Sequence, residues 1–191
     1  MAILTSSRRL LAQCAVVFSC AVIMGGHAVA QAMPGALEYQ VKAAYLLNFT
    51  RYVDWPPSVF EDTDAPLTLC VVGRDPFGEV LERTIAGRHT AGRPLRILRP
   101  DRPAGDVCHV TFFGETTPPT REAWIAALEH EPTLTVGDGG DFARSGGMIG
   151  FVIRGETVRF EINVEAVRSA GLQISSRVLT LATRLYEREG S

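Results

Sequence analysis

Short apolar runs with the character of β-strands recur along the chain and alternate with segments of helical spacing. The runs cover residues 67–72, 92–98, 107–113 and 134–136. Asp75 is a good N-cap for a helix with Pro76 at its first position, and Thr120 caps a helix over residues 121–130. Strands and helices that alternate over short connections predict an α/β fold: a single three-layer domain with a largely parallel sheet and flanking helices.

The pattern changes within residues 146–163. Two apolar runs flank Arg154-Gly155-Glu156, which is typical of a β-hairpin. We expect this hairpin to add antiparallel strands to one side of the sheet, with Arg159 and Glu161 on a polar face. Asn163 then caps a helix that Gly171 ends, and a last helix covers residues 177–189 after Ser175 or Ser176.

The first helix, residues 37–53, ends before Pro56-Pro57 and is apolar around most of its circumference. One stripe of this helix consists of Leu37, Val41, Tyr45, Asn48 and Tyr52, and the next consists of Leu46, Phe49 and Val53. Such a helix is either deeply buried or covered by a second chain. Asn48 needs a polar partner, either the backbone or a ligand.

Residues 1–30 have the organisation of a secretory signal peptide. Arg8-Arg9 precede an apolar stretch from Leu10 to Met24, and Ala28-Val29-Ala30 is a small-residue cleavage pattern. The stretch is shorter than the ~20 residues of a membrane span. We therefore expect a removed signal peptide and a mature domain over residues 31–191, with lipid attachment at Cys20 as the alternative.

The mature chain is mildly acidic. Without Arg8 and Arg9, 17 basic residues face 21 acidic ones, which gives a net charge near −4. This charge balance does not indicate a basic surface that could bind a phosphate backbone, so we expect no nucleic-acid partner.

Two of the four cysteines, Cys14 and Cys20, lie in the expected signal peptide, which leaves Cys70 and Cys108 in strand-like runs. An exported chain with two such cysteines favours one disulfide, and two buried free thiols are the alternative. The usual order of a doubly wound sheet places the first and third strands side by side, which agrees with a bridge. Two distant cysteines do not make a metal site.

Residues for catalysis do not gather in the sequence. His89, His109 and His130 lack metal-ligand spacing, and Ser145 lacks a nucleophile elbow. The sequence therefore predicts a protein that is not an enzyme and has no cofactor or metal.

A small anion or a nucleotide phosphate is the one ligand that the sequence suggests. Arg74, Arg159 and Arg177 lie near predicted helix N-termini, and Asp75 adjoins the first of them. Solvated surface arginines are the alternative. These residues are the ligand-binding candidates of a second hypothesis, a periplasmic protein that binds a small molecule or nucleotide.

An ordered set of motifs resembles the YfiR family. The set comprises residues 39–56, Gly73-Arg-Asp-Pro-Phe-Gly78, Gly92-Arg-Pro94, Cys108-His-Val110, Gly146-Gly-Met-Ile-Gly-Phe151, Arg159-Phe-Glu-Ile-Asn163 and Gly171-Leu-Gln-Ile-Ser-Ser176. The resemblance implies a periplasmic regulator that binds the sensory domain of an inner-membrane diguanylate cyclase of the YfiN type. Binding holds the cyclase inactive, and release raises cyclic di-GMP and favours biofilm.

The resemblance also implies redox-sensitive folding that a disulfide stabilises, and a tendency to form a homodimer. Family members can carry a second disulfide, but this sequence has no cysteine between Glu115 and Glu161 to form one. We therefore expect the dependence of its folding on oxidation to differ from that of members with two disulfides.

For the surface that binds the cyclase, the hairpin and its exit present both apolar and charged groups. The partner-binding candidates are Met148, Phe151, Glu161 and Val164. A core position is the alternative for Met148 and Phe151.

Overall fold

The computed structural model describes residues 34–103 and 107–187. The predicted signal peptide, its cleavage after Ala30 and the alternative of lipid attachment at Cys20 lie outside the described residues.

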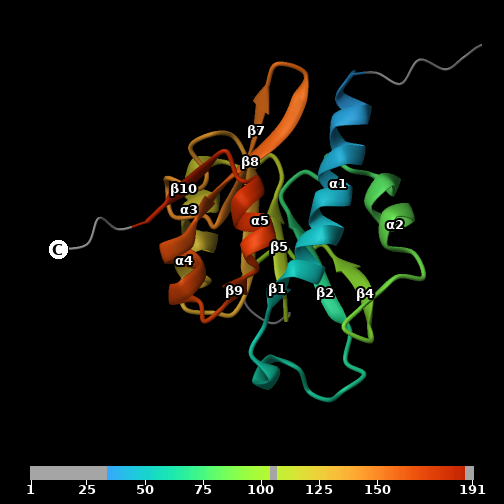
Figure 1. The fold of residues 1–191 in the computed structure, drawn as a ribbon. Coiled ribbons are helices and arrows are strands. Elements are labelled where there is room, and N and C mark those ends of the chain that lie inside the picture. The colour runs from blue at the N-terminus through green and yellow to red at the C-terminus, as the bar shows by residue number, and fades with distance from the viewer. Residues whose placement is uncertain (1–33, 104–106, 188–191) are drawn as a thin grey trace, which may run out of the picture. The chain divides into compact units, whose positions relative to one another are not determined.

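Helices and strands alternate through most of the chain. In order they are α1 (Pro34–Tyr52), β1 (Val53–Asp54), the 3₁₀ turn η1 (Pro57–Val59), β2 (Leu67–Val72), α2 (Glu79–Ile85), β3 (His89–Thr90), β4 (Arg93–Leu98), β5 (Val110–Phe113), α3 (Pro118–Ala127), β6 (Leu134–Asp138), β7 (Ile149–Arg154), β8 (Thr157–Asn163), α4 (Val164–Ser169), β9 (Gln173–Ile174), α5 (Ser176–Leu181) and β10 (Arg184–Tyr186). Figure 1 shows their arrangement.

An eight-stranded sheet has the order β10-β8-β7-β6-β5-β2-β4-β3. The strands from β7 through β6, β5 and β2 to β4 are parallel. The hairpin β7–β8 is antiparallel, as the sequence predicts, and β10 pairs with β8 in parallel. Only the two-residue strand β3 lies beyond β4, so β4 is close to one edge of the sheet.

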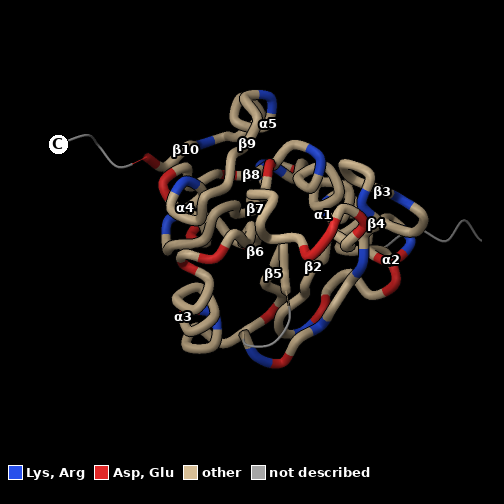
Figure 2. The backbone as a smooth tube through the Cα atoms, turned by 90° about the horizontal axis from the view of Figure 1, so that it is seen from below, with Lys and Arg blue, Asp and Glu red and all other residues tan. Residues whose placement is uncertain are grey.

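Helices cover both faces of this sheet, so the predicted α/β fold with three layers is confirmed. The larger core joins α1, α2, α4 and α5 to one face of the strands, and its largest buried side chains include Phe49, Phe112, Phe151 and Phe160. A smaller cluster on the other face joins Val72 and Phe113 to Trp124 and Leu128 of α3 and its C-terminus. In Figure 2, α1 and α5 lie on one side of β5–β8, and α3 lies on the other.

The adjacent strands β2 and β5 bring the two mature cysteines together. Cys70 and Cys108 form a disulfide, with their Cα atoms 5.7 Å apart. The prediction of a bridge is therefore confirmed, and the alternative of two free thiols is wrong. The strand order supplies the reason, since it places β2 directly beside β5.

Two predicted helix starts differ from the structure. Asp75 caps no helix: its Oδ1 accepts a hydrogen bond from the Phe77 N–H at 2.7 Å, which closes a turn, and α2 begins only after Gly78 at φ +51°. In α3 the cap is Thr117, whose side chain accepts from the Thr120 N–H, and two prolines open the helix.

The last helix is shorter than predicted. The sequence predicts a helix over residues 177–189, whereas α5 ends at Leu181 and the chain then joins the sheet as β10. The Thr183 N–H donates to the Phe160 carbonyl of β8 at 2.9 Å. The backbone after α5 therefore forms hydrogen bonds with the sheet in place of those of a longer helix. Leu181, the last residue of α5, is 62% exposed.

His109 lies buried beside the disulfide, at the start of β5. Its Nδ1 accepts a hydrogen bond from the Thr68 N–H at 3.0 Å, and its ring stacks on Phe60 with centroids 4.6 Å apart. Burial lowers the pKa of His109 to about 4, and the positive charges of Arg96 and Arg93 act in the same direction. The folded protein therefore keeps this imidazole neutral near pH 5, where the unfolded chain protonates it.

We expect Phe151→Ala to lower the free energy of unfolding by about 3–5 kcal/mol, because the ring is 2% exposed and packs on Phe49. Ile153→Ala, two residues along the same strand, is the matched control, since Ile153 is 49% exposed and should cost less than about 1 kcal/mol. Chemical denaturation measures both values. Equal losses for the two variants would contradict the core position of Phe151.

We expect His109→Asn to flatten the pH dependence of stability. As pH falls from 7 to 5, the unfolded chain (pKa near 6.5) takes up a proton that folded His109 refuses, so this residue lowers the free energy of unfolding by about 2 kcal/mol. Below about pH 4 both states are protonated and the loss stops growing. Asparagine keeps an acceptor for the Thr68 N–H but does not titrate. Denaturation at pH 7 and pH 5 tests this, and an unchanged difference between the two would refute it.

Candidate functional site

The carboxyl ends of β2, β5 and β6 meet at one edge of the sheet, where open α/β sheets usually bind ligands. Beyond β2 and β5, the chain is held together by backbone hydrogen bonds between Arg74 and Glu115 at 3.1 and 3.3 Å. A Cβ atom at Gly114 would lie 2.2 Å from the Arg74 carbonyl oxygen, so this close approach requires glycine.

The first two ligand-binding candidates are engaged in ion pairs at this edge. The Arg74 guanidinium pairs with the Glu115 carboxylate on the surface. Asp75 Oδ2 accepts from Arg99 Nε at 2.9 Å. A bound anion would have to compete with Glu115 for Arg74.

The four ligand-binding candidates do not line a common hollow. Arg74 lines a hollow of about 560 Å³ with Tyr39 and Asp138, whereas Arg177 lines one of about 290 Å³ between α1 and α5. Arg159 is exposed on β8. The structure therefore offers two separate positions for a ligand, and the role of these residues stays a prediction.

A buried lysine, which the sequence analysis missed, lies at the carboxyl end of β6. Lys42 of α1 is 3% exposed, and its Nζ lies 2.7 Å from Asp138 Oδ1 and in contact with Glu38. The Tyr39 hydroxyl donates to Asp138 Oδ2 at 2.8 Å. Burial, then the hydrogen bond to Asp138, raises the pKa of Tyr39 above its usual range.

This polar cluster of Glu38, Tyr39, Lys42 and Asp138 fastens α1 to the end of the sheet. The lysine charge is compensated by two carboxylates, so it is not a free cation that could hold an anionic ligand. The signal in the sequence was a Glu38–Lys42 pair, four residues apart, within an otherwise apolar helix.

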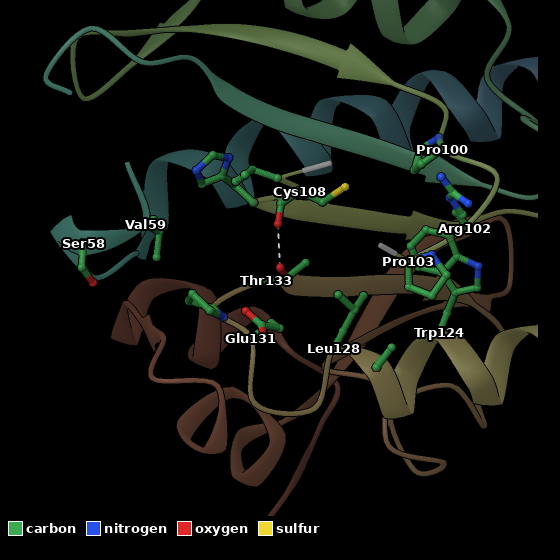
Figure 3. Close-up of a pocket in the computed structure, with 14 residues that line it drawn as sticks. Ser58, Val59, Pro100, Arg102, Pro103, Cys108, Trp124, Leu128, Glu131 and Thr133 are labelled. Carbon is green, nitrogen blue, oxygen red and sulfur yellow. Dashed lines mark hydrogen bonds between the residues drawn. The ribbon is translucent and has the colours of Figure 1, made fainter. Parts of the chain in front are cut away.

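The amino end of the sheet carries a further hollow, of about 480 Å³, beside the disulfide. Figure 3 shows Trp124 and Leu128 on one side of it and Ser58 and Val59 on the other. The Thr133 hydroxyl donates to the Cys108 carbonyl at 2.6 Å, which ties the starts of β5 and β6 together.

The four partner-binding candidates of the hairpin and its exit are buried. Exposed fractions are 3% for Met148, 2% for Phe151, 4% for Glu161 and 6% for Val164. The expectation that the hairpin presents these side chains at the surface is therefore wrong. Met148, Phe151 and Val164 belong to the core between α1, α4, α5 and the sheet. Glu161 points to the opposite face of β8, where the Tyr186 hydroxyl of β10 contacts it.

Glu161 is the charged member of that buried set, although the sequence places it on a polar face. Its Oε2 accepts from the Tyr186 hydroxyl at 2.8 Å, and its Oε1 lies 3.4 Å from an Arg154 nitrogen. The hydrogen bond to Glu161 raises the pKa of Tyr186.

Apolar side chains are instead exposed along α1. The α1 stripe, as we call Leu37, Val41, Tyr45, Asn48 and Tyr52, lies on the side of this helix away from the core except at Tyr45, which is half-buried against the core rings. Leu37 is 57% exposed, Val41 38% and Tyr52 37%. The structure thus resolves the alternatives for this helix: its inner stripe is core, and its outer stripe is exposed at Leu37 and Val41, whereas the rest of the stripe lines the hollow between α1 and α5. Asn48 is exposed, so the alternative of a buried amide is wrong, and a contact with a ligand stays a prediction.

Metal binding and membrane spanning find no support in the described part of the chain. Within residues 34–103 and 107–187, no three His, Cys, Asp or Glu side chains are grouped to hold a metal ion. None of the helices in these ranges is both long and apolar enough to cross a bilayer.

Comparison with solved structures shows similarity of fold only. A conserved domain protein from Vibrio cholerae O1 biovar El Tor aligns with a TM-score of 0.52 and 14% identity, over 77% of this chain and 60% of that one. An ABC domain in complex with L-Trp from Streptococcus pneumonia aligns with a TM-score of 0.46 and 11% identity, over 62% of this chain and 54% of that one. The chain thus spans less than two thirds of either structure.

No curated protein matches the sequence. A sequence model of the family described as YfiR/HmsC-like matches residues 39–183, which is more than half of the chain. These residues include every helix and strand from β1 to α5 and most of α1. The chain therefore belongs to the YfiR/HmsC-like family.

Proposed function

We propose that this protein is a periplasmic regulator that binds the periplasmic sensor domain of an inner-membrane diguanylate cyclase and holds the cyclase inactive. The family match over residues 39–183 is the observation that carries the proposal. Through this inhibition the protein lowers cyclic di-GMP and biofilm formation.

The disulfide supports a place outside the cytoplasm. The bond between Cys70 and Cys108 is suited to an oxidising compartment such as the periplasm. The sequence pattern of residues 1–30, which is typical of a cleaved signal peptide, points to the same compartment.

Inhibition by binding alone requires no catalytic group. A regulator that binds one conformation of a sensor domain shifts the population toward it, by as much as its affinities for the two conformations differ. To move the cyclase from a 99:1 to a 1:99 ratio of active to inactive molecules, that difference must be about 10⁴-fold. A folded surface with apolar and polar groups is sufficient for such a preference.

The α1 stripe is the surface we assign to the cyclase. Its exposed leucine, valine and tyrosine form the kind of apolar patch that marks protein–protein contacts. Beside it, Arg51 and Arg177 are exposed and supply the charged rim that interfaces commonly have. This assignment replaces the buried hairpin residues as the direct contact.

A second copy of the chain is the other occupant that the α1 stripe would suit, through an isologous pairing of two helices. The family resemblance implies a tendency to dimerise. Homodimer formation and cyclase binding would then compete for one surface.

A small-molecule-binding role is the second candidate function. The hollow beside Arg177 favours it, because its wall is aromatic and its rim carries a positive charge. A thermal-shift screen of small anions and nucleotides tests it, since a ligand that binds the folded state raises the melting temperature. Arg177→Ala would abolish such a shift.

We expect Val41→Glu to weaken binding to the purified sensor domain of a diguanylate cyclase from the same organism at least about tenfold, because a charge would be desolvated in an apolar contact. Val107→Glu is the matched control: Val107 is 52% exposed and lies at the amino end of β5, away from α1. Biolayer interferometry measures both affinities, with thermal unfolding as the check on folding.

Equal affinity of Val41→Glu and wild type for the sensor domain would refute the α1 stripe as the cyclase surface. Sedimentation velocity of the same two variants shows whether the stripe holds a second copy. A dimer that Val41→Glu dissociates, with cyclase binding unchanged, would assign the stripe to self-association.

A further inference from the structure

Strand β10 is the outermost strand of the sheet on the hairpin side and the last element of the fold (Figure 1). It pairs in parallel with β8, with Arg184 opposite Glu161 and Tyr186 opposite Asn163. The family match ends at residue 183, immediately before this strand. The match therefore includes β8 and ends before β10.

The attachment of β10 is shallow. Arg184 is exposed and Leu185 is 42% exposed, so the strand buries little apolar surface. Leu181 at the end of the preceding helix is 62% exposed, and only Val178 of that helix is buried. Further contacts include the backbone pairing with β8, packing against α4, the Tyr186 hydroxyl bond to Glu161 and a surface ion pair of Arg168 with Glu187 at 3.9 Å. Segments with few buried apolar contacts open at low free energy, well below global unfolding.

The edge of β8 that β10 covers could pair with another strand. Without β10, the outward backbone N–H and C=O groups of β8 would be unpaired, and such groups are a template for a further strand. The Glu161 carboxylate, 4% exposed, takes one hydrogen bond from the Tyr186 hydroxyl and pairs with Arg154 at 3.4 Å. If β10 detached, this carboxylate would lose its shorter contact and would favour a donor from another strand.

We propose that β10 occupies in cis the place of a strand from the protein partner, and that the edge of β8 is a β-augmentation site. The partner segment is extended, runs parallel to β8 and carries a basic or hydroxyl side chain that faces Glu161. Tyr186 supplies the hydroxyl in cis, and Arg184 lies opposite Glu161 in the strand register. Identification of the partner as the cyclase sensor domain rests on the proposed function; the edge itself does not.

The device regulates access. Only molecules in which β10 is detached can bind the partner strand. The apparent affinity is therefore the intrinsic affinity multiplied by the fraction of molecules in which β10 is detached. Detachment would also uncover Glu161, the one charged residue among the sequence-predicted partner contacts, which is otherwise closed to solvent.

The test uses the full mature chain with Leu185→Pro, which removes a backbone N–H at the centre of β10 and disfavours its pairing. Leu185→Ala, which keeps this N–H and shortens a side chain that is 42% exposed, is the matched control. The probe is a synthetic peptide of residues 182–190, with a scrambled peptide as its control. We expect Leu185→Pro to bind the peptide at least about tenfold more tightly than wild type or Leu185→Ala. Adding Glu161→Gln should reduce that gain.

Hydrogen exchange on the wild-type chain gives a second measurement. We expect the Arg184–Tyr186 amides to exchange at least about 100-fold faster than the β8 amides paired with β7. Equal protection of the two strands would overturn the proposal. So would loss of cooperative unfolding in Leu185→Pro, which would make β10 an integral part of the core, or an unchanged peptide affinity.

The partner is decided separately with the purified sensor domain. Tighter binding of Leu185→Pro than of Leu185→Ala supports the strand assignment. If the peptide binds but affinity for the sensor domain stays unchanged, the partner assignment is overturned, while the proposed function still stands or falls with Val41→Glu. A dimer that Leu185→Pro alone dissociates would assign the edge to a second copy and overturn it as well.

Discussion

The packing of aromatic rings between α1 and the sheet is the interaction on which the rest of the structure depends. Phe49 of α1 lies 5.3 Å from Phe160 and 6.0 Å from Phe151, measured between ring centroids, and Tyr45 closes the same group. Aromatic pairs at such spacing bury large apolar areas and prefer defined orientations. They therefore fix the rotation of α1 about its own axis. This rotation decides which side of the helix packs on the sheet and which side is left for a partner.

Once α1 is fixed in this way, Leu37, Val41 and Tyr52 of its outer stripe remain exposed. The polar cluster around Lys42 holds the end of the helix near the carboxyl edge of the sheet, because the buried ammonium needs both Asp138 and Glu38. The disulfide and His109 connect β2 and β5 near their amino ends. A scaffold that is held at both ends of its strands suits the proposed binding of one partner conformation, since little ordering entropy is lost at the interface.

The hairpin supports function indirectly. Phe151 and Met148 belong to the core against which α1 packs, and Tyr186 of β10 forms a hydrogen bond with Glu161. Changes at these positions would affect the partner surface through the packing of α1 or the pairing of the edge strand. The two proposed surfaces, the α1 stripe and the β8 edge, are linked by α5, which packs against α1 and leads into β10.

Local sequence patterns alone determined the strands β2, β4, β5 and β6, the hairpin and the helix that Asn163 caps. Each depends on short-range periodicity or on capping chemistry, which residues near in sequence encode. The sequence favoured a bridge between Cys70 and Cys108, but the bridge itself needs the pairing of β2 with β5, which brings two residues 38 positions apart together. The tertiary structure decided which side of α1 is buried, the burial of Glu161 and the conversion of residues 184–186 from predicted helix to strand. Those outcomes depend on partners far away in the chain: helical spacing at the C-terminus satisfies local propensity, but the open edge of β8 offers hydrogen bonds that only the folded sheet provides.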